Sequence, residues 1–408
     1  MTDEQKFGEG RMNTDYNQSN LMRLIRASLW GTERGPVGQA EFEEMMHQAI
    51  AALPAEILAS LHLPDELYRI WKKQILQTVF DNTHYVHEQS SLPVRVPYVI
   101  LKGTAAAQYY PRPEYRSMGD IDIMTRREDF DTACRDLLEN GFTEITQSHQ
   151  EDFGRHRSFS RNGVMVEAHV FFALLNDPKQ AKYLDDLIIG GINPSHILPD
   201  PVNGLVLLEH IDQHFEEGLG LRQIIDWMMF VDRCLPDEKW PEFRKLAKNI
   251  GLEQLAVITT RMCEMYMGLK EHAWSRGADE RTCEQLMTYV ISSGNFGTKR
   301  TGDSGVSVNL MTYIRTPAAF FRLLQERGMV NWKAAQRHAV LRPFAWLYQL
   351  IRYQILGLKR KGAAVKIRDE FNASRERIEL FDKLGVKQIS RGLAVYENGE
   401  YVKTYKRP

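Results

Sequence analysis

Two aspartates, Asp120 and Asp122, lie two residues apart in the otherwise apolar stretch GDIDIM. The neighbouring Ile121, Ile123 and Met124 indicate a buried strand, in which a carboxylate is costly unless a cation or a hydrogen-bond donor pairs with it. Side chains alternate along a strand, so both carboxylates should face the same side of a sheet. They would repel each other there, and a hard divalent cation with oxygen ligands, Mg2+ or Mn2+, would relieve the repulsion.

A third acid, Glu167, lies in the stretch VMVEAHV, two residues before His169. We expect this stretch to form a neighbouring strand, antiparallel to the first, so that Glu167 joins the two aspartates as a metal ligand or a base. Three carboxylates on adjoining strands are typical of phosphoryl or nucleotidyl transfer, in which metal ions neutralise a polyphosphate. The alternatives are an exposed strand position for Glu167 and a hydrogen-bonded structural histidine, instead of an accessory residue, for His169.

The stretch ILKGTAAAQ indicates a strand that runs directly into a helix, and it contains Lys102, Gly103 and Thr104. Free backbone N–H groups at a helix start, a glycine that permits close approach, a hydroxyl and an ammonium group are all ligands for phosphate. Arg116, four residues before Asp120, would add a further positive contact. We therefore predict that these three residues and Arg116 bind a nucleotide. A lysine at a strand end that reaches solvent is the alternative for Lys102.

Five stretches with strand character surround these residues: YVILK, DIDIMT, FTEITQ, HRSFSR and VMVEAHVFF. Asn162-Gly163, between the last two, predicts a tight hairpin. Helical patterns dominate on both sides, and the helix expected from residue 65 should bury a stripe of Tyr68, Trp71, Ile75, Val79 and Val86. The expected division is a disordered tail at 1–18, a helical region at 19–92, an α+β sheet domain at 93–184, and a helical domain at 185–408 with a terminal hairpin turning at Asn398-Gly399.

The composition sets limits on the partners of the 408-residue chain. Its 52 basic and 53 acidic residues leave a net charge of -1, which argues against a long nucleic acid as a stable partner. The most apolar long stretch, near residue 345, is interrupted by charged residues, so we expect no membrane span. The four cysteines form no CxxC pair, and the first residues are polar, so we expect a cytoplasmic protein with reduced thiols.

Three further features allow more than one interpretation. His210 and His214 have metal-ligand spacing, although we favour a packed, hydrogen-bonded pair. Arg222 and Asp226, also four apart, are expected to form an ion pair. The glycine-rich stretch GNFGTKRTGDSG is interpreted as a linker, with contact to phosphate as the alternative.

The ordered set LKG, YRSMGDIDIMT and VMVEAHV resembles a largely uncharacterised bacterial nucleotidyltransferase family of the DNA polymerase beta-like superfamily. The resemblance implies an α+β fold, with a small mixed sheet as the nucleotidyltransferase core and helical regions on both sides. It also implies roles for five residues: Gly103 and Thr104 match the phosphate-binding Gly-Ser pair, Asp120 and Asp122 the metal pair, and Glu167 the third acid. The later stretch LLEHIDQHFEEGLGLRQIIDWMMF is similar to the helical continuation of the same family.

The resemblance and the residues together predict an enzyme that uses Mg2+ or Mn2+. It would transfer a nucleoside monophosphate, AMP in the first instance, from ATP or another nucleoside triphosphate to a hydroxyl of a small molecule or a protein. One alternative is a nucleotide-binding or regulatory protein on the same fold without turnover. Two others are a metal hydrolase built on His210 and His214, and an interaction scaffold.

Overall fold

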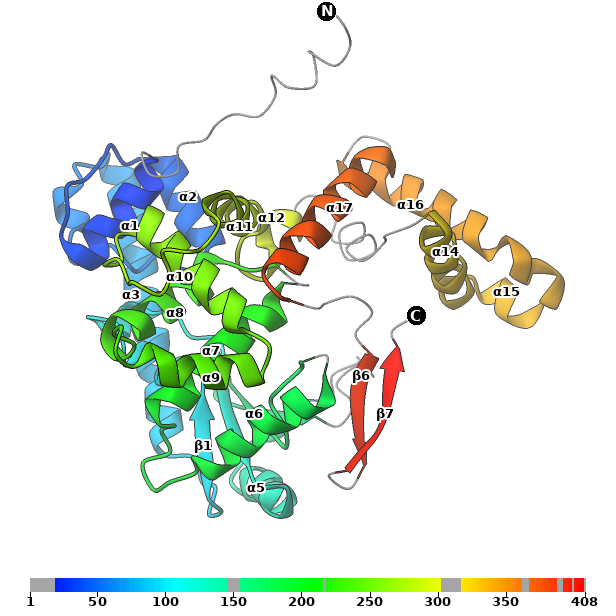
Figure 1. Ribbon diagram of the computed structural model, residues 1–408, viewed down its shortest axis with the longest axis horizontal. Helices are drawn as coiled ribbons and strands as arrows, with labels where there is room; N and C mark the ends of the chain where they lie inside the picture. The colour runs from blue at the N-terminus through cyan, green and yellow to red at the C-terminus, as the bar shows by residue number, and fades with distance from the viewer. Residues whose placement is uncertain are drawn as a thin grey trace, which may run out of the picture.

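A computed structural model of the chain describes residues 19–145, 155–175, 177–215, 218–301, 317–361, 367–386, 392–397 and 400–406 (Figure 1). The expected tail at 1–18 and the expected turn at Asn398-Gly399 lie outside these residues. The predicted α+β class, a small mixed sheet with flanking helices, is confirmed. No helix in the described part of the chain has both the length and the apolar character to cross a membrane.

The first described helices are α1 (Asn20–Trp30), α2 (Gln39–His47), the short η2 (Leu58–Ser60) and the long α3 (Asp65–Ser90). The expected apolar stripe of α3 holds only in its first half, where Trp71 and Ile75 are buried. Further along, the same face buries the polar Asn82, while Val86 is exposed. This half of α3 contacts the loop before the second strand, so its buried face satisfies backbone polar groups and not only apolar neighbours.

Five strands form one sheet in the order β1-β2-β5-β4-β3. They are β1 (Tyr98–Leu101), β2 (Ile121–Thr125), β3 (Thr143–Ile145), β4 (His156–Arg161) and β5 (Val164–His169), with α4 (Gly103–Ala107) and η3 (Pro113–Tyr115) between the first two. The turn from β4 to β5 is the predicted hairpin, because Asn162 and Gly163 have φ of 53° and 81°, as a type I′ turn requires.

One predicted pairing is wrong, because β5 runs parallel to β2 and not antiparallel to it. The reason is the crossover through α5 (Arg127–Glu139), which returns the chain to the end of the sheet where β2 began, so that β3 runs in the direction of β2. The two antiparallel steps from β3 to β4 and from β4 to β5 then restore that direction in β5. Among the four neighbouring pairs of this sheet, β2 and β5 are therefore the one parallel pair.

The sheet separates two apolar cores. On one face Ile121, Ile123, Val166 and Ala168 pack with side chains of α5. On the other face Leu101 belongs to the larger core, which it shares with buried residues of α7 and α8. Because side chains alternate, Asp122 on β2 and Glu167 on β5 point to this second face, on the side of α7 and α8.

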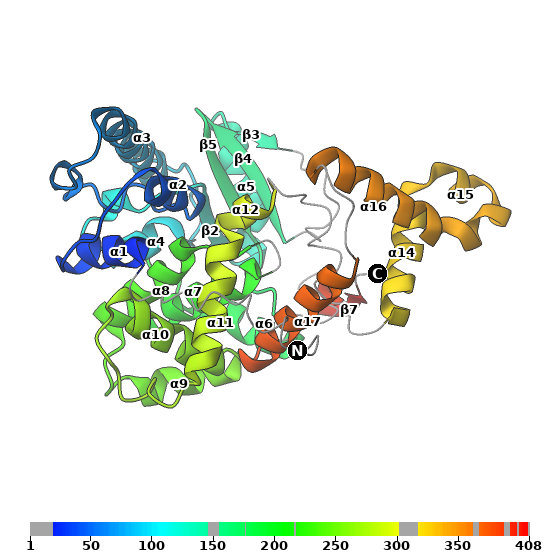
Figure 2. The same ribbon diagram turned by 90° about the horizontal axis from the view of Figure 1, so that it is seen from above.

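The described residues between the sheet and the last two strands are mostly helical. After the sheet come α6 (Pro178–Gly190), α7 (Asp200–His214), α8 (Leu221–Cys234), α9 (Trp240–Asn249), α10 (Glu253–Met267), α11 (Glu280–Ser293), η4 (Asn295–Gly297) and α12 (Thr298–Thr301). Then follow α14 (Pro317–Asn331), α15 (Lys333–Arg337), η5 (Ala339–Phe344), α16 (Ala345–Lys361), α17 (Ile367–Lys383), β6 (Gly392–Glu397) and β7 (Glu400–Lys406). Strands β6 and β7 pair antiparallel. Figures 1 and 2 both show α14, α15 and α16 projecting away from the sheet and its covering helices.

Candidate active site

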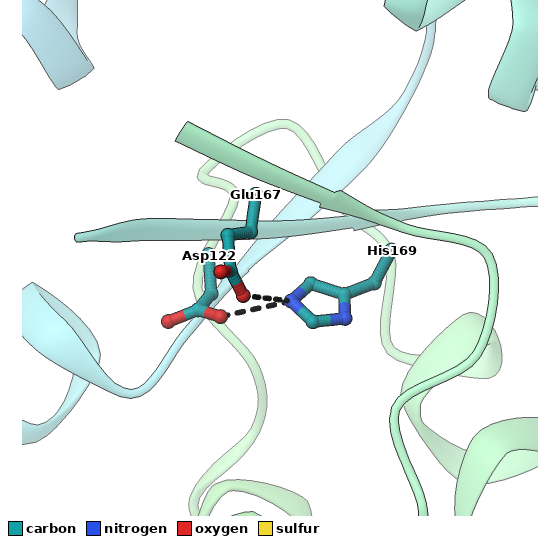
Figure 3. Close-up of side chains that lie close together, drawn as sticks. All are labelled: Asp122, Glu167 and His169. Carbon is teal, nitrogen blue, oxygen red and sulfur yellow. Dashed lines mark hydrogen bonds and ion pairs between the residues drawn. The ribbon is translucent and has the colours of Figure 1, made fainter. Parts of the chain in front are cut away.

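Three side chains with metal-binding atoms meet on the face of the sheet that lies toward α7 and α8. Asp122 and Glu167 are direct partners in the parallel register of β2 and β5, and His169 lies two residues further along β5. One ligand atom from each of the three lies within 4.8 Å of the others. Figure 3 shows the two carboxylates and the imidazole turned toward one another. The structure thus brings together two of the three predicted acids and the predicted accessory histidine.

Asp122 is the centre of this cluster and is only 1 % exposed. Its Oδ1 accepts hydrogen bonds from His169 Nε2 and from Lys102 Nζ, both at 2.8 Å. Burial alone would raise the pKa of Asp122, but the charge of Lys102 and the hydrogen bond from His169 outweigh it and hold that pKa well below its usual range. Asp122 is therefore ionised at neutral pH.

The second carboxylate, Glu167, shares the same imidazole. His169 Nε2 lies 3.5 Å from Glu167 Oε2, and His156 Nε2 lies 3.7 Å from Glu167 Oε1. Burial raises the pKa of Glu167, but the contact with His169 prevails and leaves that pKa below its ordinary value. Both carboxylates are thus held in the charged form in which they could bind a cation.

One acceptor atom of the cluster has no hydrogen-bond partner among the described residues. This atom is the buried Asp122 Oδ2. An uncompensated buried carboxylate oxygen is unfavourable. One aspartate, one glutamate and one histidine form a donor set that suits a divalent cation such as Mg2+ or Mn2+. The residues present therefore fit the expected metal.

Asp120 lies just before β2, which begins at Ile121, and is partly exposed. The charge of Asp122, followed by burial, raises the pKa of Asp120 to about 6. The repulsion expected between the two aspartates is present, although Asp120 belongs to the loop and not to the strand. A cation bound beside both would remove its cause.

The Lys-Gly-Thr turn places an ammonium group against these acids. Lys102 and Gly103 follow β1 with φ of 52° and 36°, a left-handed conformation that is costly for a lysine. The Lys102 side chain is 12 % exposed, so it does not reach out into solvent as the alternative interpretation required. Burial lowers its pKa, but Asp122 and Asp120 outweigh burial and raise it. Thr104 Oγ1 donates to Gln89 Oε1 at 2.7 Å, which fixes the hydroxyl at the start of α4.

Arg116, for which the sequence predicted a contact with phosphate, has its guanidinium paired with an aspartate. Its Nε and Nη2 donate to the two carboxylate oxygens of Asp226 at 2.8 and 2.6 Å, and its Nη1 donates to the Ser117 carbonyl at 3.2 Å. A guanidinium and a carboxylate match in this two-pronged geometry, and the pair is buried. The expected pairing of Asp226 with Arg222 is replaced by this one, and Arg116 holds the loop before Asp120 to α8.

Asn82 on α3 is a contributor that the sequence interpretation missed. Its Nδ2 donates to the carbonyls of Glu114 and Arg116 at 2.8 and 2.7 Å, and its Oδ1 accepts from Met118 N at 3.1 Å. One side chain thus satisfies three backbone groups in the loop that leads to Asp120. The sequence does contain a signal for this role, because Asn82 lies on the same face of the helix as the buried Trp71 and a buried polar side chain needs hydrogen-bond partners.

The histidines of α7 form a hydrogen-bonded pair, and no third metal-binding side chain among the described residues joins them. His210 Nε2 and His214 Nε2 lie 2.8 Å apart, as a hydrogen bond between two neutral rings requires. Burial lowers the pKa of both, that of His214 to about 3. The group of described residues that could hold a metal is the one on the sheet.

A small mixed sheet whose central parallel strands carry ionised carboxylates, with a lysine beside them, is the arrangement expected of a nucleotidyltransferase. The model of an uncharacterised nucleotidyltransferase family matches residues 43–268, over half of the chain, and the chain belongs to this family. The predicted family is thereby confirmed. Comparisons with curated proteins and with solved structures gave no match.

Proposed function

We propose that the protein transfers a nucleoside monophosphate from a nucleoside triphosphate to a hydroxyl group, with release of pyrophosphate. The proposal rests mainly on one observation, the buried cluster of Asp122, Glu167 and His169 with its unpartnered Asp122 Oδ2. Membership of a nucleotidyltransferase family supports the reaction class. ATP is the nucleotide we propose first, and the acceptor is a small molecule or a protein.

In this proposal Asp122 and Glu167 hold Mg2+ or Mn2+, and Asp120 adds a third carboxylate. The ion, when bound, would neutralise the polyphosphate and favour departure of pyrophosphate. His169 orients both carboxylates through its Nε2 or joins them as a ligand. Glu167, if it is not needed as a ligand, is placed to accept the proton of the attacking hydroxyl.

Lys102 has a double role in the proposal. Without a cation it neutralises Asp122. A divalent cation at the carboxylates would repel its ammonium group, which could then bind a phosphate instead. Gly103 and Thr104 would face the same phosphates from the start of α4, in line with the family resemblance.

We further propose that 93–184 is the catalytic core and that the neighbouring helical regions complete the site. All the residues to which we give a role in binding or catalysis lie in that core. Asn82 and Asp226, which hold the loop before Asp120, lie before and after the core in the sequence. The four free cysteines support a reducing, cytoplasmic setting.

The proposal is tested with the full-length protein and Asp122→Asn. Mn2+ binding is measured by titration calorimetry, and transfer is followed with α-32P-labelled nucleotides and a panel of hydroxyl acceptors. We expect Asp122→Asn to lose Mn2+ binding and label transfer together, while Asp131→Asn, on the exposed side of α5, keeps both. Nucleotide binding that is equal in both variants, with no transfer to any acceptor, would favour the nucleotide-binding protein without turnover.

A further inference from the structure

Arg222, the second residue of α8, is a buried cation that has no matching anion among the residues that the structure describes. It is 8 % exposed, and no carboxylate of the described residues lies within ion-pair distance of its guanidinium. Its Nη1 makes one long hydrogen bond, 3.4 Å, to the Ser117 carbonyl, and its Nε has no partner in the described part of the chain. The acid four residues along, Asp226, is already taken by Arg116. A buried charge in this state is costly unless a ligand pairs with it.

The position of Arg222 relates it to the proposed active site. Ser117, which accepts its hydrogen bond, lies three residues before Asp120. The charge of Arg222 reaches Asp120, whose pKa it lowers against the effect of Asp122. It also lowers the pKa of His214, as does the charge of Lys102. Lys102 and Arg222 are thus two of the cations around the histidine pair, beside Arg155 and the already paired Arg116.

Acids and cations are thus both present, in the combination that a metal–polyphosphate complex requires. Asp122 and Glu167 could supply oxygens for a metal, and Lys102 and Arg222 could supply positive charge for phosphates. A planar guanidinium binds phosphate oxygens in pairs, and its charge does not depend on pH in the neutral range.

An aromatic ring covers the guanidinium. Arg222 Cζ lies 5.3 Å from the centre of the Phe296 ring, and that ring meets His214 edge-on with 4.7 Å between centroids. Phe296 is 46 % exposed and has φ of 52°, an unusual conformation for a residue with a side chain. Phe296 lies beyond residue 268, where the family match ends, so this cover is contributed by the later part of the chain.

The turn that carries Phe296 is fixed by its neighbours. A Cβ on Gly218 would lie 2.2 Å from Gly297 N, so only glycine permits this approach. Gln223 Nε2 donates to Asn295 Oδ1 at 2.9 Å, and Thr298 Oγ1 donates to the His47 carbonyl at 2.9 Å. This part of the glycine-rich stretch, interpreted from the sequence as a linker, is therefore an anchored turn. Its ring and the guanidinium beneath it are held in place before any ligand arrives.

We infer that Arg222, covered by Phe296, binds the polyphosphate of the nucleotide and fills the role that the sequence assigned to Arg116. The inference rests on the proposed function, because the ligand is the triphosphate of the same site. It adds a phosphate ligand from α8 and an aromatic cover from the turn after α11. The site then draws on three separate parts of the chain.

Inorganic triphosphate with Mg2+ tests the inference, because it carries the anion without a base. Its affinity for the full-length protein is measured by calorimetry for the wild type, Arg222→Gln and the matched control Arg233→Gln, an exposed arginine on the same helix. We expect Arg222→Gln to weaken triphosphate binding about tenfold or more, the range for charge-assisted hydrogen bonds. Mn2+ binding should stay within about twofold, because the metal ligands are untouched, and Arg233→Gln should match the wild type.

A folded Arg222→Gln protein, shown by wild-type Mn2+ binding, with unchanged triphosphate affinity would overturn the inference. So would a wild-type protein that binds Mn2+ but no triphosphate. If Arg222→Gln does not fold, Phe296→Leu is the variant that tests the inference. The Phe296 side chain is half exposed, so we expect this variant to fold. Loss of the ring should weaken triphosphate binding about two- to fivefold, and unchanged affinity would count against the inference.

The outcomes separate the inference from the proposed function. Loss of triphosphate binding in Arg222→Gln, without label transfer by the wild type, would retain the binding site and discard the reaction. The reverse result is label transfer that Asp122→Asn abolishes but that a folded Arg222→Gln protein keeps, together with full triphosphate affinity. It would retain the proposed reaction and discard Arg222 as a phosphate ligand.

Discussion

Asp120 and Asp122 are held near each other at a cost to the stability of the fold. The negative charge of Asp122 is the main reason that the pKa of Asp120 rises to about 6. Lys102 and His169 stabilise the ionised form of Asp122 and lower its pKa. The pKa of Asp120 nevertheless remains raised, so its ionised form is destabilised. Residues that bind a charged ligand are often destabilising when the ligand is absent.

Asp120→Asn should therefore stabilise the metal-free protein. At pH 8 with a chelator present, removing the ionised carboxylate relieves the repulsion by Asp122 and should raise the free energy of unfolding by about 1–2 kcal/mol. Urea unfolding measures this, with Asp131→Asn on α5 as the exposed control. An Asp120→Asn protein that is less stable than the wild type under these conditions would contradict the assignment of a strained acid pair.

At the scale of elements, the loop between η3 and β2 is tied to two helices. Asn82 holds it from α3, and the Arg116–Asp226 pair, with Tyr110 Oη donating to Asp226 Oδ1 at 2.8 Å, holds it from α8. The loop carries Asp120, so the position of that carboxylate depends on helices far apart in the sequence.

Arg116→Gln should act on stability, because it leaves the Asp226 carboxylate buried without its partner. We expect a loss of about 3–5 kcal/mol, and a double variant with Asp226→Asn that is less destabilised than the sum of the two single variants. Thermal and urea unfolding measure both. Arg112→Gln, at a surface pair with Glu56, should cost less than about 1 kcal/mol. Additive effects, or weakened triphosphate binding without loss of stability, would restore Arg116 as a ligand.

Asp185 on α6 holds the segment after β5, since its Oδ1 accepts from the backbone N–H groups of Phe172 and Ala173 at 2.9 and 3.0 Å. Burial raises its pKa from 3.8 to about 7. The folded state thus keeps a proton that the unfolded state releases, and the wild type should lose stability as pH rises from about 4 to about 7.

Asp185→Asn keeps an oxygen that can accept both N–H groups but cannot ionise. Its stability relative to the wild type should therefore increase over that pH range, by about 1–3 kcal/mol in total. Unfolding at several pH values measures the difference, and Asp186→Asn, at a surface pair with Lys182, should show none. A difference that is flat with pH would mean that Asp185 is ionised throughout.

At the scale of the whole molecule, the four free cysteines test the packing of several elements at once. Burial raises the pKa of Cys134 and Cys234 to about 11 and of Cys283 to about 12, and that of Cys263 lies well above its ordinary value. We expect little reaction of any of them with iodoacetamide at pH 7.5, and rapid reaction of all four in urea, as read by mass spectrometry. Rapid labelling of Cys234 alone would mean that the end of α8 is open.

The sequence predicted the parts of the site that depend on local pattern. The alternation around Asp122 and Glu167, and the Asn162-Gly163 turn, follow from strand geometry and from the φ values that a hairpin requires. The parallel pairing of β2 with β5 was missed, because direction depends on how α5 crosses the sheet. Arg222 was missed because its isolation results from Arg116 taking Asp226, over a hundred residues away in the chain, which no spacing rule reveals.

The far end of the chain also limits how short an active fragment could be. Leu380 on α17 and Leu384 just after it belong to the large core. The ring centroid of Phe381 lies 5.0 Å from that of Phe215, the residue that caps α7. A protein shortened to residue 361 would keep every side chain assigned to the site. It would nevertheless uncover Phe215, directly after the helix that carries His214. Fragments designed from the family match alone, ending at 268, should therefore be poorly soluble, whereas those that extend through α17 should not.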